Sequence, residues 1–395
     1  MTIRHIYRAM LLSSMSVLLP IAAYAQDDSA VRLKKDLAAL AGPGMAGRGN
    51  GQEGLEKAVK YLLDSYKKMG LKPQIQPFTL RSTNAQNNEP DIQLNNVIVV
   101  INGSDPELSK EHIVIGAHLD HLGTRPGRGG RPPTIFYGAD DNGSGSVALI
   151  ELVRHFQKNP PARSLVFIHF SGEEWGLLGS NHWVANSTVD IKSVQFMVNL
   201  DMIGRFDNEK GILTFTAMGM GSKDIERAKE LAPKGVTLEA DRGTSVFAQA
   251  SDQAPFASKG IPTCFLFTGI HPDYHKATDT IEKINFGGLA TIAKFAISLV
   301  AEYAATADVP KFQPVGDLGI YISPWEKAVV TFVMPDGAAS LAGLKFQDIL
   351  THINEHTVET AKNYRTALDQ FNRGDKVKLK WLRGDVAMEA EAVLK

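Results

Sequence analysis

Five short segments of the chain place histidine and carboxylate side chains at spacings that suit a metal site. They contain His118 with Asp120, Asp140 with Asp141, Glu173 with Glu174, Asp201, and His275. Two imidazoles and several carboxylates, without a thiolate, suit zinc and leave coordination positions open to water. A site for two metal ions needs one carboxylate to bridge ions about 3.5–4 Å apart, and further ligands for each ion. The pair Glu173 and Glu174 could supply one ligand and one base, which would pass a proton from the water to a leaving amine.

The elements that must position these residues are strands of a parallel sheet. Four apolar runs end shortly before a candidate segment, and they cover residues 112–117, 164–170, 194–200 and 263–267. Helical patterns separate these runs, so that strands and helices alternate from about residue 95 to 305. This alternation predicts an α/β fold with a mostly parallel central sheet flanked by helices. Ligands of such sheets bind beyond the carboxyl ends of the strands, where we expect the candidate segments to meet.

Each segment taken alone has an ordinary structural explanation. A single histidine such as His118 is more often packed or on the surface than bound to a metal. The pair Glu173 and Glu174 would suit a solvated helix start, and Asp141 in the sequence DNGSG would suit a turn and helix cap. The recurrence of carboxylate and histidine clusters at successive strand ends favours the functional interpretation.

At these segments the sequence resembles a family of zinc aminopeptidases. The family includes secreted bacterial leucyl-type aminopeptidases, with glutaminyl cyclases and glutamate carboxypeptidases as relatives. The motifs that carry the resemblance are GAHLD at 116–120, GADDNGSG at 138–145, SGEEWGLLGS at 171–180, NLDM at 199–202 and DYHKATDT at 273–280. They occur in the family order and cover about residues 33–305. Each motif is weak alone, and together they are highly specific.

The resemblance implies two Zn²⁺ ions and five metal ligands. These are His118 and Asp201 at one ion, Glu174 and His275 at the other, and Asp141 as the bridge. Within the Asp140-Asp141 pair it selects Asp141 for the bridging position. It also implies a cis peptide bond between Asp141 and Asn142.

Three further residues receive roles from the same resemblance. Asp120 would orient His118, as metal-bound histidines generally require. Glu173 would be the general base that moves a proton from the zinc-bound water to the leaving nitrogen. Tyr274 would help to stabilise the tetrahedral oxyanion. A free amino terminus bound against carboxylates near the metals would make the enzyme an exopeptidase.

Several neighbouring residues have less defined expectations. His121 and His271 lie near the site in the sequence and could contact substrate. Arg205 could bind a substrate carboxylate or form a plain surface salt bridge. Asp252 resembles part of a family segment near the pocket. We expect His169 to occupy an ordinary core or surface position.

The amino terminus has the features of an export signal. Arg4 and Arg8 supply a basic start, the apolar stretch 10–22 is too short to span a bilayer comfortably, and the segment 23–25 (AYA) is a small-x-small cleavage site. We expect residues 1–25 to be a signal peptide and the rest of the chain to be periplasmic or secreted, without a membrane span.

Composition narrows the remaining function classes. The net charge is −1, so no basic excess points to nucleic acid. Cys264 is the single cysteine, which excludes an intramolecular disulfide and a cysteine-based zinc site. Its apolar surroundings predict a small core residue.

A different module follows Pro310 and Pro314. From residue 316 the pattern is mostly strand, with a helix near 361–371, and it resembles a PDZ domain. The sequence LGIYI at 318–322 is similar to the carboxylate-binding loop and the next strand of such domains. A groove of this kind would bind a peptide carboxyl terminus as an added strand. The alternative is a small β module that only packs on its neighbour.

The domain organisation and function follow from these parts. We expect a zinc aminopeptidase domain over residues 26–308 and a PDZ-like domain over residues 309–395. The leading hypothesis is an exported two-zinc metallo-aminopeptidase that acts on peptides with a free N-terminus. One alternative is a glutaminyl-cyclase-like acyl transferase, which would generally use one zinc. Another is a PDZ peptide-binding protein with an inactive peptidase domain, against which the intact Glu173 argues.

Overall fold

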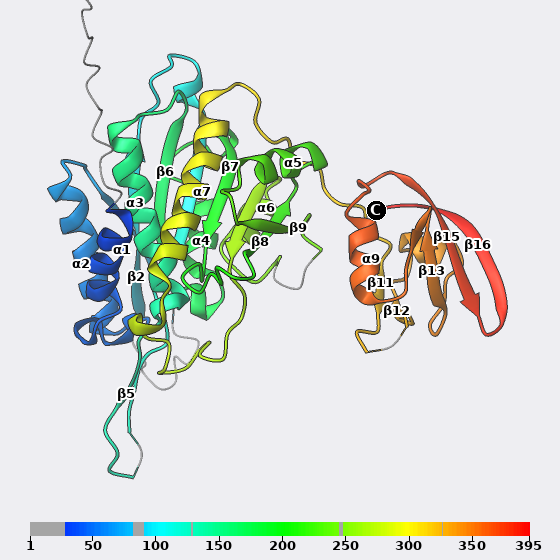
Figure 1. The fold of residues 1–395 in the computed structure, drawn as a ribbon, viewed down its shortest axis with the longest axis horizontal. Helices are drawn as coiled ribbons and strands as arrows, with labels where there is room; N and C mark the ends of the chain where they lie inside the picture. The colour runs from blue at the N-terminus through cyan, green and yellow to red at the C-terminus, as the bar shows by residue number, and fades with distance from the viewer. Residues whose placement is uncertain (1–27, 82–90, 128, 245–247, 326) are drawn as a thin grey trace, which may run out of the picture.

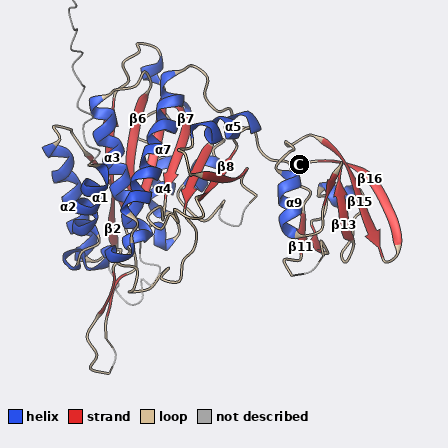
Figure 2. Ribbon diagram, viewed as in Figure 1, coloured by secondary structure: helices blue, strands red, loops and turns tan. Residues whose placement is uncertain are grey.

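The computed structural model contains a larger unit built around one sheet and a smaller unit at the carboxyl terminus (Figures 1 and 2). It describes residues 28–81, 91–127, 129–244, 248–325 and 327–395. The predicted signal segment at residues 1–25 lies outside the described residues, and its role stays a prediction.

The central sheet of the larger unit has eight strands in the order β1-β2-β6-β3-β7-β10-β8-β9. They span Gln74–Leu80 (β1), Ile92–Ile101 (β2), His112–His118 (β3), Ser164–Phe170 (β6), Val194–Leu200 (β7), Ile212–Met218 (β8), Thr237–Asp241 (β9) and Thr263–Phe267 (β10). The four central strands β6, β3, β7 and β10 run parallel. The strand pairs β1–β2, β2–β6 and β10–β8 are antiparallel. The predicted α/β fold with a mostly parallel sheet is confirmed.

Helices cover both faces of the sheet, which explains why its central strands are apolar throughout. The helices of the larger unit are Ser29–Leu40 (α1), Glu53–Lys68 (α2), Gly145–Lys158 (α3), Leu178–Ala185 (α4), Ser222–Leu231 (α5), Gln253–Ala257 (α6) and Phe286–Ala305 (α7). The main core joins α1, α2, α3 and α7 to one face. A second core joins Trp183 of α4 and Phe256 of α6 to the other face. Cys264 of β10 is fully buried in the main core, as expected.

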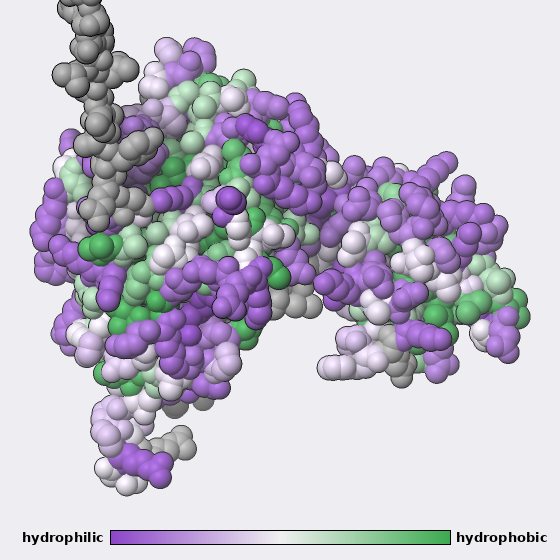
Figure 3. Space-filling model, viewed as in Figure 1, coloured by the Kyte–Doolittle hydropathy of each residue, from purple (hydrophilic) through white to green (hydrophobic). Residues whose placement is uncertain are grey.

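Helix α7 is the one helix among the described residues that is long and apolar enough to cross a membrane. Most of its side chains are buried against the sheet and the neighbouring helices α1 and α3. A core helix of a globular domain has the same length and composition. The exposed face seen in Figure 3 is mainly hydrophilic over α5 and over much of the smaller unit.

The smaller unit has a hydrophobic core of its own. Its elements are Ile320–Ile322 (β11), Val330–Val333 (β12), Ala338–Leu341 (α8), Ile349–Ile353 (β13), His356–Thr357 (β14), Ala361–Leu368 (α9), Lys376–Arg383 (β15) and Val386–Val393 (β16). The strands form two antiparallel sheets, β11–β12 and β14-β13-β15-β16. The expected small, mostly β module is therefore present, while its predicted boundary at residue 309 stays a prediction.

A buried arginine joins the two units. The guanidinium of Arg242, which follows β9, donates hydrogen bonds to the main-chain oxygens of Gln313 and Asp369 and to Oδ1 of Asn372. Oδ1 of Asp369 in turn accepts a hydrogen bond from Oγ1 of Thr244. Arg242 is 4% exposed, so these contacts are shielded from water.

The core under the sheet contains a histidine that is held neutral. Tyr66 of α2 and His169 of β6 are both buried, and the Tyr66 hydroxyl lies 2.7 Å from Nε2 of His169. Burial lowers the pKa of His169 to about 3. His169 therefore has the core position that was one of its two expected placements. Because the unfolded chain binds a proton near pH 6.5 and the folded chain does not, this residue makes stability depend on pH.

Replacing His169 by Gln removes this titration. The folded-state pKa of His169 is depressed. The stability that depends on its neutral form is therefore fully present above pH 6.5, and it is lost as the pH drops from 6.5 toward 3. Below pH 6.5 the unfolding free energy of the wild type should decline by about 1.4 kcal/mol per pH unit more steeply than that of the variant. Urea unfolding at pH 7, 6 and 5 measures the difference. Equal pH slopes for the two proteins would contradict the assignment.

Candidate metal centre

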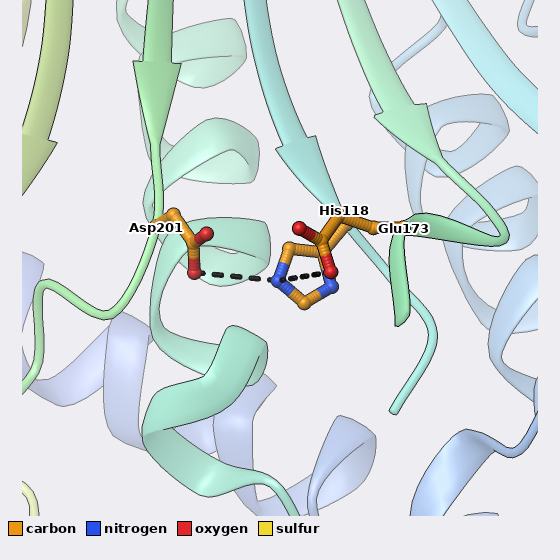
Figure 4. Close-up of side chains that lie close together, drawn as sticks. All are labelled: His118, Glu173 and Asp201. Atoms are coloured by element: carbon orange, nitrogen blue, oxygen red, sulfur yellow. Dashed lines mark hydrogen bonds and ion pairs between the residues drawn. The ribbon is translucent and has the colours of Figure 1, made fainter. Parts of the chain in front are cut away.

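Three neighbouring strands bring candidate residues to one point beyond the carboxyl edge of the sheet. His118 is the last residue of β3, Asp201 follows β7, and Glu173 begins a short 3-10 helix after β6. These ends are adjacent because β3 pairs in parallel with both β6 and β7. Figure 4 shows His118 between Asp201 and Glu173. The expectation that the segments meet at this edge agrees with the structure.

One group of side chains has the spacing of ligands on a single metal ion. Nε2 of His118 lies 3.3 Å from Oδ1 of Asp201 and 3.3 Å from Oδ1 of Asp141. Ligand atoms on one tetrahedral zinc lie about 3.4 Å apart, given metal–ligand bonds of roughly 2.0–2.2 Å. Oε2 of Glu173 is farther from the same nitrogen, at 4.0 Å. The three closer residues could hold an ion while Glu173 stands beside it.

A second group lies against the other oxygen of Asp141. Nε2 of His275 is 3.2 Å from Oδ2 of Asp141 and 3.2 Å from Oε2 of Glu174. Oδ2 of Asp141 is buried and receives no hydrogen bond of good geometry from any described residue. A cation would complete such an environment. The two oxygens of Asp141 thus face two different ligand groups, which is the disposition of a bridging carboxylate.

The structure separates the roles of Asp140 and Asp141. Oδ2 of Asp140 lies 3.1 Å from Nε2 of His271, and Oδ1 accepts a hydrogen bond from the Gly204 amide. The peptide bond between Asp141 and Asn142 is cis, as the resemblance implied. Asp140 therefore anchors the loop, and Asp141 is the residue presented to the site.

Arg205 stabilises this loop through a second carboxylate. Oδ2 of Asp279 accepts hydrogen bonds from the amides of Asp140 and Asp141. Oδ1 of Asp279 accepts a hydrogen bond of 2.9 Å from Nη2 of Arg205. The other terminal nitrogen of Arg205, Nη1, lies 3.4 Å from Oδ2 of Asp273. Of the two interpretations of Arg205, the structure supports the salt bridge, with Asp279 fully buried and Arg205 partly buried.

Asp120 contributes in a different way from the one expected. The carboxylate of Asp120 is 3.9 Å from Nδ1 of His118, and it is the main-chain oxygen of Asp120 that accepts a hydrogen bond from this nitrogen, at 3.0 Å. The carboxylate instead accepts hydrogen bonds from the amides of Glu173 and Glu174. Nδ2 of Asn50 donates a third, at 2.7 Å. Asp120 thus holds the backbone of Glu173 and Glu174 with its side chain, and the ring of His118 with its main-chain oxygen.

The surroundings of Glu173 favour its proton-bound form. Burial raises the pKa of Glu173 well above its usual range, and the nearby carboxylates of Asp201, Asp252 and Asp120 raise it further against the opposing effect of His118. A carboxylate with a raised pKa binds a proton more tightly, a property that suits a general base. Burial likewise raises the pKa of Asp252 to about 7, so this side chain belongs to the same buried acidic group.

Tyr274 lies at the open side of the site. Its ring stacks on that of His275, with centroids 3.8 Å apart, and it is 37% exposed. Burial of part of the ring and the charges of Asp141 and Glu174 raise the pKa of Tyr274 above its usual value. The hydroxyl therefore keeps its proton and can act as a hydrogen-bond donor.

Two residues of the amino-terminal segment were not anticipated. Arg48 is fully buried, and its guanidinium donates to the main-chain oxygens of Leu40, Leu119, Tyr137 and Gly138. Burial lowers its pKa to about 10, against the effect of nearby carboxylates, so it stays charged at neutral pH. Arg48 and Asn50 occur in the glycine-rich sequence GRGNG, and polar residues there are a signal that could have revealed them.

The segment around Asp252, which resembled a family segment near the pocket, forms a hydrogen-bonded group behind Asp201 that the sequence did not define. Oδ2 of Asp201 accepts a hydrogen bond of 2.8 Å from Oγ of Ser251. Ser251 and Gln253 both bind the side-chain amide of Asn199, on β7. These neutral groups fix the orientation of Asp201 without adding charge.

Comparison with known proteins gives this arrangement a family. Residues 96–300 match the model of peptidase family M28, and residues 316–394 match that of the PDZ domain. A probable leucine aminopeptidase of Arthroderma benhamiae is 30% identical over 218 residues, which cover 52% of this chain and 55% of the relative. A second, from Trichophyton verrucosum, is 30% identical and matches over 54% of this chain and 57% of its own. The chain spans about half the length of these curated relatives.

Solved structures share the fold at lower identity. A zinc aminopeptidase from Bacillus subtilis is 18% identical, with a TM-score of 0.57 over 72% of this chain and 98% of that one. A glutaminyl cyclase from Porphyromonas gingivalis is also 18% identical, with a TM-score of 0.54 over 69% and 98%. The family match covers the strands and loops that carry all five predicted ligands. This chain belongs to peptidase family M28.

Proposed function

We propose that the protein is an exported two-zinc metallo-aminopeptidase that removes N-terminal residues from peptides. The observation that carries the proposal is the position of Asp141, whose Oδ1 faces His118 and whose Oδ2 faces His275. The relatives named leucine aminopeptidases support the peptidase activity. The export signal expected at residues 1–25 supports a periplasmic or secreted location.

The residues present fit two zinc ions. His118, Asp201 and Asp141 would hold one ion, and Asp141, Glu174 and His275 the other. Their separations of 3.2–3.3 Å suit imidazole and carboxylate ligands on shared ions. Bound zinc would polarise the scissile carbonyl and lower the pKa of the attacking water.

The remaining residues move protons and orient the substrate. Glu173, 4.0 Å from the His118 imidazole, would take the proton of the water and deliver it to the leaving nitrogen. Tyr274, at the open side with its proton retained, would donate to the developing oxyanion. The excess of carboxylates near the ligands would attract a free α-amino group, which favours exopeptidase action.

The alternatives differ in what the site would do. A glutaminyl-cyclase-like transferase is the second enzyme hypothesis, because a cyclase shares the fold. A scaffold with an inactive peptidase domain is the third, and the presence of Glu173 with all five ligands favours an active enzyme instead.

The smaller unit would bind a second peptide. Strand β11 pairs with β12 on one edge, and among the described residues its other edge has no strand partner. Ile320 of β11 shares a core with Tyr364 and Leu368 of α9. A peptide carboxyl terminus would add to β11 as an extra strand, as in other PDZ domains.

Changing the base should separate catalysis from metal binding. Glu173→Gln should lower kcat by about 10²- to 10⁴-fold, because it removes the proton acceptor, and should still bind two zinc ions. Glu174→Gln should instead reduce the zinc content. Glu226→Gln, on the exposed face of α5, is the matched control and should change neither. Retained turnover in Glu173→Gln would rule out its role as the base.

A substrate panel tests the reaction type. Amino-acyl anilides should be hydrolysed, activity should disappear with a strong chelator, and added Zn²⁺ should restore it. N-acetylated versions of the same anilides should resist cleavage, because the blocked amine no longer meets the carboxylates. Cleavage of the acetylated compounds would contradict aminopeptidase action. Cyclisation of N-terminal glutamine without anilide hydrolysis would favour the transferase.

A further inference from the structure

One buried histidine lies beside the candidate metal ligands, and the sequence suggested for it only a contact with substrate. His121 lies three residues after His118, and its side chain is fully buried. Its amide donates a hydrogen bond to the main-chain oxygen of Arg48. Its ring lies against Gly138, where a Cβ atom would come within 2.5 Å of Cγ and Cδ2 of the imidazole. The hydrogen bond to Arg48 therefore fixes the backbone of His121, and Gly138 limits the tilt of its ring.

The ring presents one nitrogen to a metal ligand. Nδ1 of His121 is 2.7 Å from Oε1 of Glu174. Nε2 is buried and has no hydrogen-bond partner among the described residues. The bond to Glu174 is thus the polar contact by which the imidazole is anchored, and a carboxylate acceptor requires the proton on Nδ1.

The two oxygens of Glu174 are divided between two histidines. Oε1 accepts from His121, and Oε2 lies 3.2 Å from Nε2 of His275. A glutamate side chain has free rotation about several bonds, and a hydrogen bond to one oxygen restricts where the other can lie. With Oε1 held, Oε2 is directed at the place where His275 and Asp141 converge.

His121, Asp141 and Glu174 lie close enough together to hold an ion, so the individual distances must decide between a hydrogen-bond donor and a metal ligand. Atoms that share a tetrahedral zinc lie about 3.4 Å apart, and His275 meets this spacing with both of its neighbours. The 2.7 Å separation of His121 and Glu174 is shorter and matches a charge-assisted hydrogen bond. His121 is also 3.6 Å from Oδ2 of Asp141. The spacing to Glu174 favours a donor role for His121 over direct ligation.

We propose that His121 is a positioning residue that orients Glu174 through Nδ1 and thereby sets the affinity of the second metal position alone. This inference rests on the proposed two-zinc function. The first position, built from His118, Asp201 and Asp141, shares Asp141 with the second, but it uses Oδ1 of that carboxylate, whereas His121 lies nearest Oδ2. Loss of an outer hydrogen bond to a metal ligand typically weakens metal binding by about 10- to 100-fold.

Two substitutions of similar shape isolate the hydrogen bond. His121→Asn keeps an N–H donor at the place of Nδ1, whereas His121→Leu fills the same space without a donor. Stepwise zinc affinities of the full chain, from competition with a chromophoric chelator, are the readout. The second affinity of His121→Leu should fall about 10- to 100-fold with the first unchanged. His121→Asn should stay within about threefold of the wild type at both positions, as expected when the hydrogen bond is retained.

Each other result has a defined meaning. If His121→Leu binds the second zinc as the wild type does, the inference is wrong and the two-zinc function stands. If His121→Asn loses as much affinity as His121→Leu, the ring itself is required, and the donor role is wrong. A wild-type protein that binds a single zinc would overturn the proposed function, and the inference with it.

Discussion

Mutual repulsion of buried carboxylates is the constraint around which the larger unit is arranged. Eight acidic side chains gather at one edge of the sheet: Asp120, Asp140, Asp141, Glu173, Glu174, Asp201, Asp252 and Asp279. Their charges cannot be buried together without compensation. Part of this compensation comes from histidines, from the buried Arg48, from Arg205 and from backbone amides. Divalent cations at the two ligand groups would supply the rest.

The compensating groups act in different ways. Arg205 pairs directly with Asp279, whereas Nε2 of His118 and Nε2 of His275 lie within 3.3 Å of the two oxygens of Asp141. Arg48 bonds only to main-chain oxygens, so its positive charge reaches Asp141 and Asp120 through space without competing for their oxygens. This separation leaves the inward oxygens of Asp141 available to metal ions.

The residues that could do chemistry were easier to predict from the sequence than the residues that hold them in place. Strands such as β3 and β7 were recognisable because a parallel strand buried on both faces is apolar throughout, and His118 and Asp201 follow from their ends. Roles that depend on the orientation of particular atoms could not be predicted from the sequence. Spacing could not show that the main chain of Asp120, rather than its carboxylate, meets His118. Arg48 and Asn50 were missed because contacts across about 70 residues leave no periodic pattern. The antiparallel pairing of β10 with β8 could not be predicted, because these strands are also far apart in the sequence.

The buried Arg48 also changes where the working unit of this protein begins. Similarity to the family model starts at residue 96, yet Arg48 and Asn50 donate hydrogen bonds to Leu119 and Asp120 beside the site. The first two helices are thus not a dispensable leader, because they carry the turn that holds the strand ends in place. A boundary drawn at the start of the family match would separate Arg48 and Asn50 from the candidate ligands. A fragment that keeps the candidate site intact must therefore include residues 48–50 as well as the segment that the family model matches.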